Sequence, residues 1–286
     1  MKKMLLLALL QCCVWGSVSA AEVKDIAYYD KDFPVTGDVK YLRERCKLDL
    51  RTPDGVKNFP TIVWFHGGGL ARGNKFYPQP LDYERVAVAA VNYRLSGKGA
   101  SCPDYIYDAA AAAAWVKKHI KEFGGDPNMV FVAGHSAGGY LTAMIALADK
   151  YLAAYGVKPK DFAGFFPFSG QMTTHFQVMK ERKDKGEKVP DILIDEFSPI
   201  GNASANAPEI TLLMGDRNWD WPARLEENLL LEARLRRVYK VTTVRCIEIP
   251  STAHGSMRVP GCTLMYNFIL YAVKMRDKKA KKANTK

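Results

Sequence analysis

The segment 134–138, with the sequence GHSAG, constrains the possible fold of this chain more than any other feature. It lies between an apolar run, which predicts a strand, and a pattern that predicts a helix. A strand that turns at once into a helix holds the residue at the turn in a strained conformation and lifts its side chain above the sheet. Glycines two positions to either side let the strand and the helix approach each other. In this setting the pattern indicates a nucleophilic serine, Ser136, rather than a serine that only caps a helix.

Apolar runs alternate with helical patterns through the rest of the chain, which favours a mostly parallel central sheet flanked by helices. About 266 residues remain after an expected leader, and this length suits one large domain better than two small ones. The expected strands are 41–50, 60–65, 86–93, 129–133, 162–168, 209–214 and 241–249, and the expected helices are 105–123, 138–155, 223–239 and 263–275.

The first twenty residues have the pattern of a cleaved export signal. Lys2 and Lys3 precede an apolar stretch that ends near Trp15, and the small residues at 18–20 predict cleavage before Ala21. The stretch is shorter than the roughly 20 apolar residues that a membrane span needs. We therefore predict a signal peptide at 1–20, a catalytic domain at 21–275 and a secreted or periplasmic protein without a stable membrane anchor.

The positive charge of the chain is concentrated at its C-terminal end. The formal net charge is +11, and removal of the leader lowers it to +9. Seven lysines and arginines within 274–286 stand against Asp277, so this end carries +6 of that charge. We expect a solvated basic tail at 276–286, with weak attraction to anionic polymers or a membrane surface as the alternative, and we expect no nucleic-acid partner.

Four cysteines follow the expected leader: Cys46, Cys102, Cys246 and Cys262. An oxidising compartment would allow two bridges in three connectivities, so disulfides and free thiols both remain open.

The segment 66–69, His-Gly-Gly-Gly in sequence, follows the apolar run 60–65. Glycines let backbone N–H groups point into a pocket without a Cβ in the way. The N–H groups of Gly67, Gly68 and Ala137 therefore form a candidate oxyanion hole, and removal of one such donor typically costs about 100- to 1,000-fold in rate. His66 is interpreted as orienting this loop.

The general base is found by elimination among five histidines. Proteins with this motif carry the acid and then the base after the nucleophile, with the base beyond the last strand. Only His254 lies there; the others are His66, His119, His135 and His175.

The acid is expected in the loop 215–222, where Asp216 and Asp220 are the two carboxylates. Asp220 is the first choice, because Asp216 follows the strand almost immediately and would brace the turn. Trp219 and Trp221 flank Asp220 and are candidate substrate-binding residues, with packing against the neighbouring helix as the alternative.

The polar segment 171–206 is too long for an ordinary connection between two core strands. A small cap over the active site and a solvated surface excursion are equally open interpretations.

Six short motifs, at 66–69, 92–95, 134–139, 198–199, 215–216 and 254–255, make the chain similar to α/β-hydrolases over roughly 41–275. It resembles the hormone-sensitive-lipase-like and BD-FAE-like (feruloyl/acetyl-esterase-like) serine esterases. This resemblance implies the α/β-hydrolase fold and hydrolysis of carboxylic esters without metal or cofactor. It also implies that Ser136 attacks, that His254 moves the proton and that water resolves an acyl-enzyme.

The chain departs from those relatives at Asn218, which stands where they usually carry the acid. Export and the resemblance together favour small-molecule or polysaccharide ester substrates, including acetyl and feruloyl esters. A peptidase or arylformamidase on the same triad is the alternative within enzymes. A non-catalytic binding protein on a hydrolase scaffold is the alternative outside them, and Asn218 is the one feature in its favour.

Overall fold

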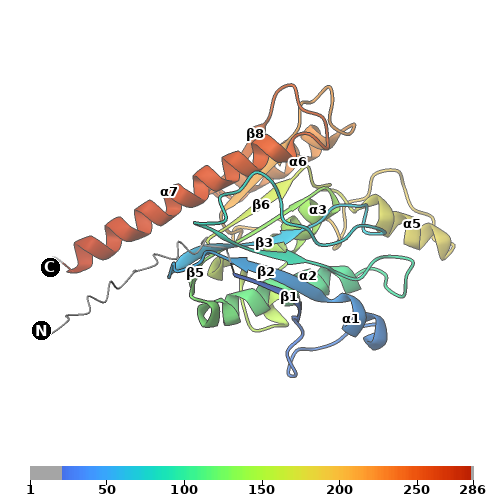
Figure 1. The fold of residues 1–286 in the computed structure, drawn as a ribbon. Coiled ribbons are helices and arrows are strands. Elements are labelled where there is room, and N and C mark those ends of the chain that lie inside the picture. The colour runs from blue at the N-terminus through green and yellow to red at the C-terminus, as the bar shows by residue number, and fades with distance from the viewer. Residues whose placement is uncertain (1–20, 285–286) are drawn as a thin grey trace, which may run out of the picture.

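The computed structural model describes residues 21–284, which form three layers with one sheet in the middle (Figure 1). The strands run in the order β1-β2-β4-β3-β5-β6-β7-β8. Pairings from β4 through β8 are parallel, whereas β2 pairs antiparallel with both β1 and β4. The strands are β1 Ala21–Ala27, β2 Lys47–Thr52, β3 Phe59–Phe65, β4 Ala87–Val91, β5 Gly125–His135, β6 Gly164–Phe168, β7 Ile210–Met214 and β8 Val244–Glu248.

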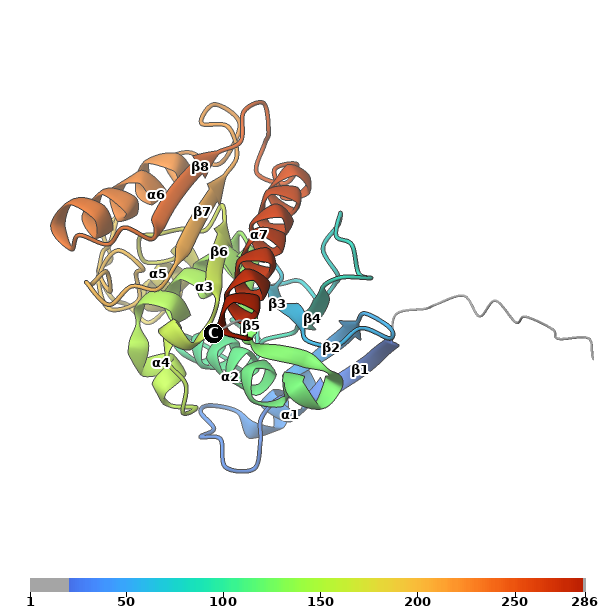
Figure 2. The same ribbon diagram turned by 90° about the vertical axis from the view of Figure 1, so that its left-hand side faces the viewer.

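Helices cover both faces of this sheet, with α2, α3 and α6 on one face and α7 on the other (Figure 2). The α-helices are α1 Val39–Arg45, α2 Asp104–His119, α3 Ala137–Leu147, α4 Asp149–Ala153, α5 Phe176–Asp184, α6 Arg224–Ala233 and α7 Arg258–Asn284. Shorter turns are η1 Ile120–Phe123, η2 Pro159–Asp161 and the π-helical η3 Arg234–Val238.

Side chains of the central strands alternate between two hydrophobic clusters, as the period of a strand requires. In β3, Val63 and Phe65 belong to the cluster under α2 and α3, whereas Ile62 and Trp64 belong to the cluster under α7. All seven residues of β3 are buried, which explains why this strand is a continuous apolar run in the sequence. The expected mostly parallel α/β architecture is confirmed.

The sequence prediction is wrong at 41–45, which belongs to helix α1 and not to a strand. The Asp38 carboxylate accepts the Tyr41 N–H at 3.0 Å, and this side-chain cap starts a helix. The expected helix at 138–155 is interrupted because Ala148 has φ −98° and ψ 87°. At the other end of the chain α7 runs from Arg258 to Asn284, well beyond the expected 263–275.

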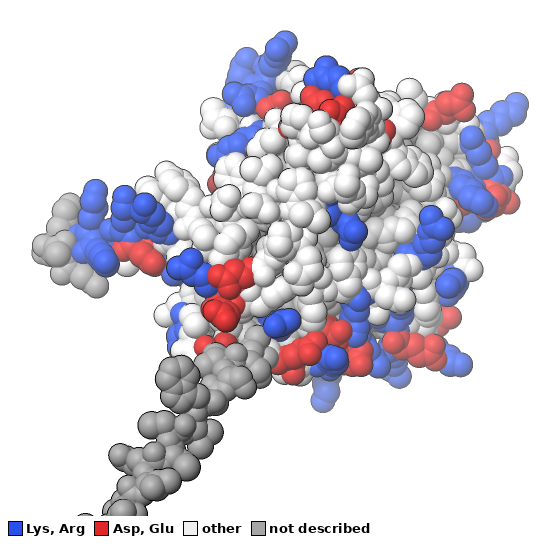
Figure 3. Space-filling model, turned by 45° about the horizontal axis from the view of Figure 1, so that its top comes forward, with Lys and Arg blue, Asp and Glu red and all other residues white. Residues whose placement is uncertain are grey.

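The C-terminal half of α7 projects from the body of the protein, and Lys and Arg side chains gather on it (Figure 3). Much of the expected basic tail is therefore helical. The expected signal peptide lies outside the described residues, and none of the described helices has the length and hydropathy to cross a bilayer. The structure holds Cys46, Cys102, Cys246 and Cys262 as free thiols.

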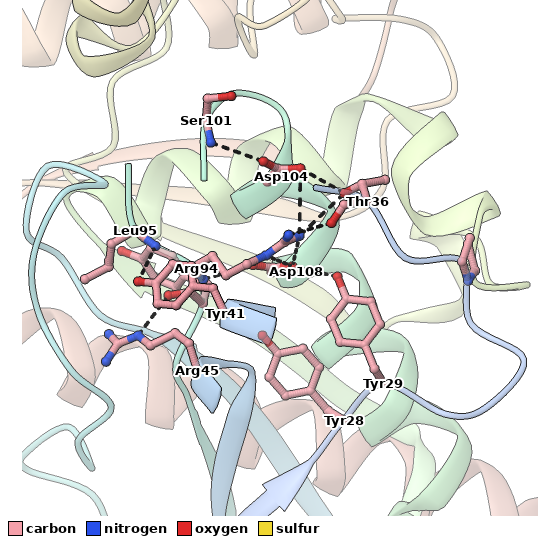
Figure 4. A network of polar contacts seen from close by, with 12 residues as sticks. Tyr28, Tyr29, Thr36, Tyr41, Arg45, Arg94, Leu95, Ser101, Asp104 and Asp108 are labelled. Atoms are coloured by element: carbon pink, nitrogen blue, oxygen red, sulfur yellow. Dashed lines mark hydrogen bonds and ion pairs between the residues drawn. The ribbon is translucent and has the colours of Figure 1, made fainter. Parts of the chain in front are cut away.

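A buried ion pair fixes the loop that follows β4 (Figure 4). Arg94 Nη2 lies 2.7 Å from Asp108 Oδ1, and both side chains are fully buried. Arg94 Nη1 also donates to the Thr36 carbonyl, and the Tyr29 hydroxyl donates to Asp108 at 2.6 Å. The network joins the N-terminal segment, the end of β4 and helix α2. Because each nitrogen of this guanidinium donates to an acceptor and the partner is a carboxylate, the buried charge is compensated.

Candidate active site

Ser136 lies at the sharp turn between β5 and α3. Its backbone has φ 59° and ψ −116°, a conformation that L-residues rarely adopt. The Ser136 N–H donates to the carbonyl of Phe168 on β6 at 2.8 Å, which stabilises the turn. Such strain persists only where the surroundings over-determine it, and it is typical of functional sites.

The two glycines of the motif are required by close packing. A Cβ on Gly138 would lie 2.1 Å from the Phe65 carbonyl oxygen, and one on Gly134 would lie 2.6 Å from the carbonyl of Gly138. These contacts are with backbone atoms, which cannot swing away as a side chain does. Helix α3 therefore lies closer to β3 and β5 than any larger residue at either position would allow.

His254, in the loop after β8, pairs with Asp220, in the loop after β7. His254 Nδ1 lies 2.7 Å from Asp220 Oδ1, and the Asp220 side chain is only 2% exposed. An ionised carboxylate accepts only, so Nδ1 carries the proton and Nε2 is left with a lone pair. The Ser169 hydroxyl lies 2.9 Å from the same nitrogen and 2.8 Å from Asp220 Oδ2.

The Asp220 carboxylate is held in its ionised form. Burial alone would raise its pKa, but hydrogen bonds from His254, from Ser169 and from the backbone N–H groups of Trp221 and Gly215 outweigh burial. Together they lower the pKa of Asp220 to about 2. A permanent negative charge next to His254 suits a group that must stabilise an imidazolium.

The other candidate carboxylate, Asp216, lies outside this arrangement. It accepts the backbone N–H groups of Asn218 and Ser251 at 2.9 and 2.8 Å, and the Asn218 side-chain amide at 3.1 Å. These bonds lower its pKa, and they tie the loop after β7 to the loop that carries His254. Asn218 completes this turn and makes no contact with the imidazole among the hydrogen bonds of the described residues.

His135, the last residue of β5, supports the loop that carries His254. Its Nε2 lies 2.6 Å from the carbonyl oxygen of His254, so Nε2 donates. Burial, followed by the neighbouring His254, lowers the pKa of His135 to about 3, and the imidazole is therefore neutral at physiological pH. His135 is a positioning residue, because it holds the His254 backbone and packs against the His254 imidazole with ring centroids 4.7 Å apart.

The glycine-rich loop after β3 lies against the nucleophile. A Cβ on Gly67 would lie 3.2 Å from the Cβ of Ser136. His66 stacks on Tyr93 with ring centroids 4.4 Å apart, and its Nδ1 donates to the Gly67 carbonyl at 2.6 Å. Burial lowers the pKa of His66 to about 4. The neutral ring therefore holds the loop through Gly67 and Tyr93, as the sequence interpretation of His66 expected.

Ser136 and His254 line one pocket with a volume of about 520 Å³. Trp221 lies on its wall, whereas Trp219 is 60% exposed and lies outside it, so only one of the two tryptophans reaches the site. The pocket is lined by Gly68, Gly69, Ala71, Arg72, His135, Ser136, Phe176, Gln177, Trp221, Arg224 and His254.

Part of the polar segment 171–206 lines this pocket. Helix α5 supplies Phe176 and Gln177, and the Phe176 ring stacks with Trp221 at 6.1 Å and 15° between planes. The carboxylate of Glu181, also on α5, binds the Ser96 hydroxyl and the Cys102 N–H. The segment is thus tied to the body through Glu181 and contributes Phe176 and Gln177 to the pocket, while the cap remains a prediction.

Sequence reasoning missed four residues of this site: Ser169, Phe176, Arg72 and Arg224. Ser169 follows β6 directly, and ligand sites in parallel sheets lie beyond the carboxyl ends of the strands. That rule was the available signal for Ser169. Among the described residues, no group of three histidine, cysteine, aspartate or glutamate side chains is arranged to hold a metal ion.

Known proteins are similar to this chain in sequence and in fold. The BD-FAE family model matches residues 48–217, which include Ser136 but end before Asp220 and His254. "Probable carboxylic ester hydrolase LipM" of Mycobacterium tuberculosis is 28% identical over 251 residues, which are 79% of this chain and 57% of LipM. The chain thus spans little more than half the length of that relative.

Solved structures give the same architecture. A truncated carbohydrate esterase from gut microbiota matches with a TM-score of 0.62 at 15% identity, covering 90% of this chain and 97% of the other. A propionate-bound esterase of Thermogutta terrifontis matches with a TM-score of 0.63 at 21% identity, covering 79% and 90%. The family model covers more than half of the chain, and the chain therefore belongs to the BD-FAE family and has the α/β-hydrolase fold.

Proposed function

We propose that the protein is a serine hydrolase that cleaves carboxylic esters through Ser136, His254 and Asp220. One observation carries the proposal: a histidine held by a buried, ionised carboxylate shares a pocket with a serine in a strained turn. Membership of the BD-FAE family supports the same chemistry. Asn218 no longer favours a non-catalytic scaffold, because Asp220 supplies the carboxylate that Asn218 cannot.

The first step is activation of the serine. With its Nδ1 proton directed to Asp220, His254 accepts the Ser136 hydroxyl proton on Nε2 while the serine oxygen attacks the ester carbonyl carbon. The imidazolium that forms lies beside a carboxylate with a pKa of about 2, which remains ionised throughout. His135 holds the His254 backbone during this transfer.

The attack places negative charge on the former carbonyl oxygen. We propose that the backbone N–H groups of Gly67, Gly68 and Ala137 bind this oxyanion, because Gly67 lies against Ser136, Gly68 lines the same pocket and Ala137 follows the nucleophile. Collapse of the intermediate breaks the ester C–O bond, and the imidazolium of His254 gives its proton to the departing alcohol. Water, deprotonated by His254, then attacks the acyl-serine, releases the carboxylic acid and returns the proton to Ser136.

The substrate class and the site of action are also proposals. Acetyl or feruloyl esters of polysaccharides suit the exposed aromatic pair of Phe176 and Trp221 at the pocket, since sugar and aryl rings stack on such faces. We propose export through the signal-like segment 1–20. Sequencing the N-terminus of secreted or periplasmic protein tests it: Ala21 as the first residue supports export, and an intact Met1 in a cytoplasmic fraction contradicts it.

Hydrolysis of p-nitrophenyl acetate, butyrate and octanoate tests the reaction. We expect turnover by the wild type, a loss of about 10⁶-fold in kcat for Ser136→Ala, as for a triad nucleophile, and normal rates for the matched control Ser204→Ala. A fluorophosphonate probe should label the wild type, and labelling should disappear in His254→Ala. Equal turnover by wild type and Ser136→Ala would refute the assignment of the nucleophile.

A further inference from the structure

The catalytic pocket has a positive wall. Of the described residues that line it, two carry a formal charge, and both are arginines: Arg72 and Arg224. Arg72 is exposed and therefore hydrated. Arg224 is only 7% exposed, although it lies on the same pocket as Ser136 and His254.

The guanidinium of Arg224 lacks the partners that a buried charge requires. Its Nε and Nη1 are buried and have no hydrogen-bond partner among the described residues. The nearest carboxylate, on Glu227, lies 4.0 Å from Nη1, and its Oε2 already accepts the N–H groups of Met172 and Thr173. Burying a charge without hydrogen bonds is costly, so the protein retains this arginine against a stability penalty.

Arg94 provides the internal comparison. It is buried to a similar extent, but its guanidinium is fully engaged by Asp108 and by Thr36. The chain thus compensates a structural arginine with a hydrogen-bonded carboxylate, whereas the nearest carboxylate to Arg224 among the described residues lies 4.0 Å away and makes no hydrogen bond to it. The Arg224 backbone is nevertheless fixed, since its N–H donates to the Trp221 carbonyl at 3.1 Å and its carbonyl accepts from Asn228 at 2.8 Å.

Nε and Nη1 are closed off from the pocket, so Nη2 is the guanidinium nitrogen that can donate to a carboxylate there, in a charge-assisted hydrogen bond. We propose that Arg224 binds a carboxylate of the substrate, so that the enzyme prefers esters with an anionic group on the acyl or the alcohol half over their neutral analogues. This inference rests on the proposed ester hydrolysis. Acyl halves of this class are dicarboxylic acid monoesters, and alcohol halves are hydroxy acids.

Two pairs of esters test the preference and locate the carboxylate. The acyl pair is 4-nitrophenyl hydrogen adipate against 4-nitrophenyl hexanoate, and the alcohol pair is 4-acetoxybenzoate against 4-acetoxybenzamide. In one pair the ratio of kcat/KM for the anionic over the neutral ester should be about 10 to 100 in the wild type, as expected for a charge-assisted hydrogen bond. In Arg224→Met this ratio should fall to about one, and Arg224→Lys should retain part of it because the charge remains.

The matched control is Arg245→Met, because Arg245 pairs with Glu209 away from the pocket and should keep both the rates and the ratio. Thermal unfolding followed by circular dichroism shows whether each variant is folded. A wild-type ratio near one in both pairs, or an unchanged ratio in folded Arg224→Met, overturns the inference while the proposed hydrolysis stands.

Binding gives a readout that does not depend on turnover. Calorimetric titration of Ser136→Ala with monomethyl adipate and with 4-acetoxybenzoate should detect binding of at least one of them. The added Arg224→Met substitution should abolish that binding. Binding in the absence of any hydrolysis by the wild type would refute the proposed function and leave the carboxylate site in place. Equal binding by the single and double variants would refute the site.

Discussion

Exchanging Asp220 for asparagine probes the centre of the proposed mechanism, because four donors converge on this carboxylate. His254 Nδ1 and the Trp221 N–H lie 2.7 Å from Oδ1, and the Ser169 hydroxyl and the Gly215 N–H lie 2.8 and 2.9 Å from Oδ2. An amide offers one acceptor oxygen and one NH₂ group. Whichever way it turns, the NH₂ group faces a backbone N–H, and one buried donor loses its partner.

The size of the effect follows from these bonds. A hydrogen bond to a charged group contributes about 1.5–3 kcal/mol, and at least two of the four are lost or weakened. The amide also cannot stabilise the imidazolium of His254. We therefore expect Asp220→Asn to lower kcat/KM for p-nitrophenyl acetate by roughly 10³- to 10⁴-fold, comparable to the same exchange in other serine triads.

Asp216→Asn is the matched control, because it makes the same chemical change in the same loop. Its activity should remain of the same order as the wild type. A larger loss for Asp216→Asn than for Asp220→Asn would transfer the acid role to Asp216, and normal activity of Asp220→Asn would remove the carboxylate from the mechanism altogether.

Unfolding measurements as a function of pH provide a second readout for Asp220. Its pKa in the folded protein is about 2, below the ordinary value of 3.8, so the folded state favours the ionised form. The resulting stability is present above about pH 4 and is lost as the pH falls through about 2. A shift of this size corresponds to roughly 2 kcal/mol. The difference in unfolding free energy between wild type and Asp220→Asn should shrink across that window.

Three further perturbations test other parts of the structure. Burial lowers the pKa of His135 and of His175 to about 3 and the pKa of His66 to about 4, so the folded state favours the neutral imidazole at each position. The free energy of unfolding should therefore decrease as the pH is lowered from about 6, by up to about 4 kcal/mol per pH unit. His175→Asn should reduce this pH dependence, measured by urea unfolding, by about a third. Gly138→Ala should destabilise the fold by at least about 2 kcal/mol in thermal denaturation, whereas Gly255→Ala, which meets nothing within 4 Å, should not. Ser169→Ala should lower kcat about tenfold with little change in KM, because one hydrogen bond to Asp220 is lost; an unchanged kcat would make Ser169 structural only.

The parts of the site that the sequence predicted are those fixed by local sterics. The elbow around Ser136 is recognisable because both of its required glycines, Gly134 and Gly138, lie within five consecutive residues and admit no substitute. The central strands are recognisable because burial on both faces makes them continuously apolar. At 41–45 the pattern was misleading: its alternation suits a strand, but the side-chain cap from Asp38 starts a helix there.

Choosing between the two candidate acids required contacts between distant segments. From sequence, Asp220 and Asp216 differ only by their distance from the strand. The structure separates them through Ser169 and His254, which lie 51 and 34 positions away from Asp220. Ser169 and His254 bind the Asp220 carboxylate, whereas Asp216 lies at the surface and ties two loops together.

Arg224 shows why a specificity residue escapes a sequence pattern. It is followed by Glu226 and Glu227 at the start of an amphipathic helix, where an arginine is ordinarily a solvated surface residue. Its burial arises because the preceding residue, Ala223, adopts a left-handed conformation with φ 62° and brings the first turn of α6 to the pocket wall. Since that backbone conformation is not encoded by any motif in 215–222, only the folded chain reveals that an arginine without hydrogen-bonded compensation lines the pocket of Ser136.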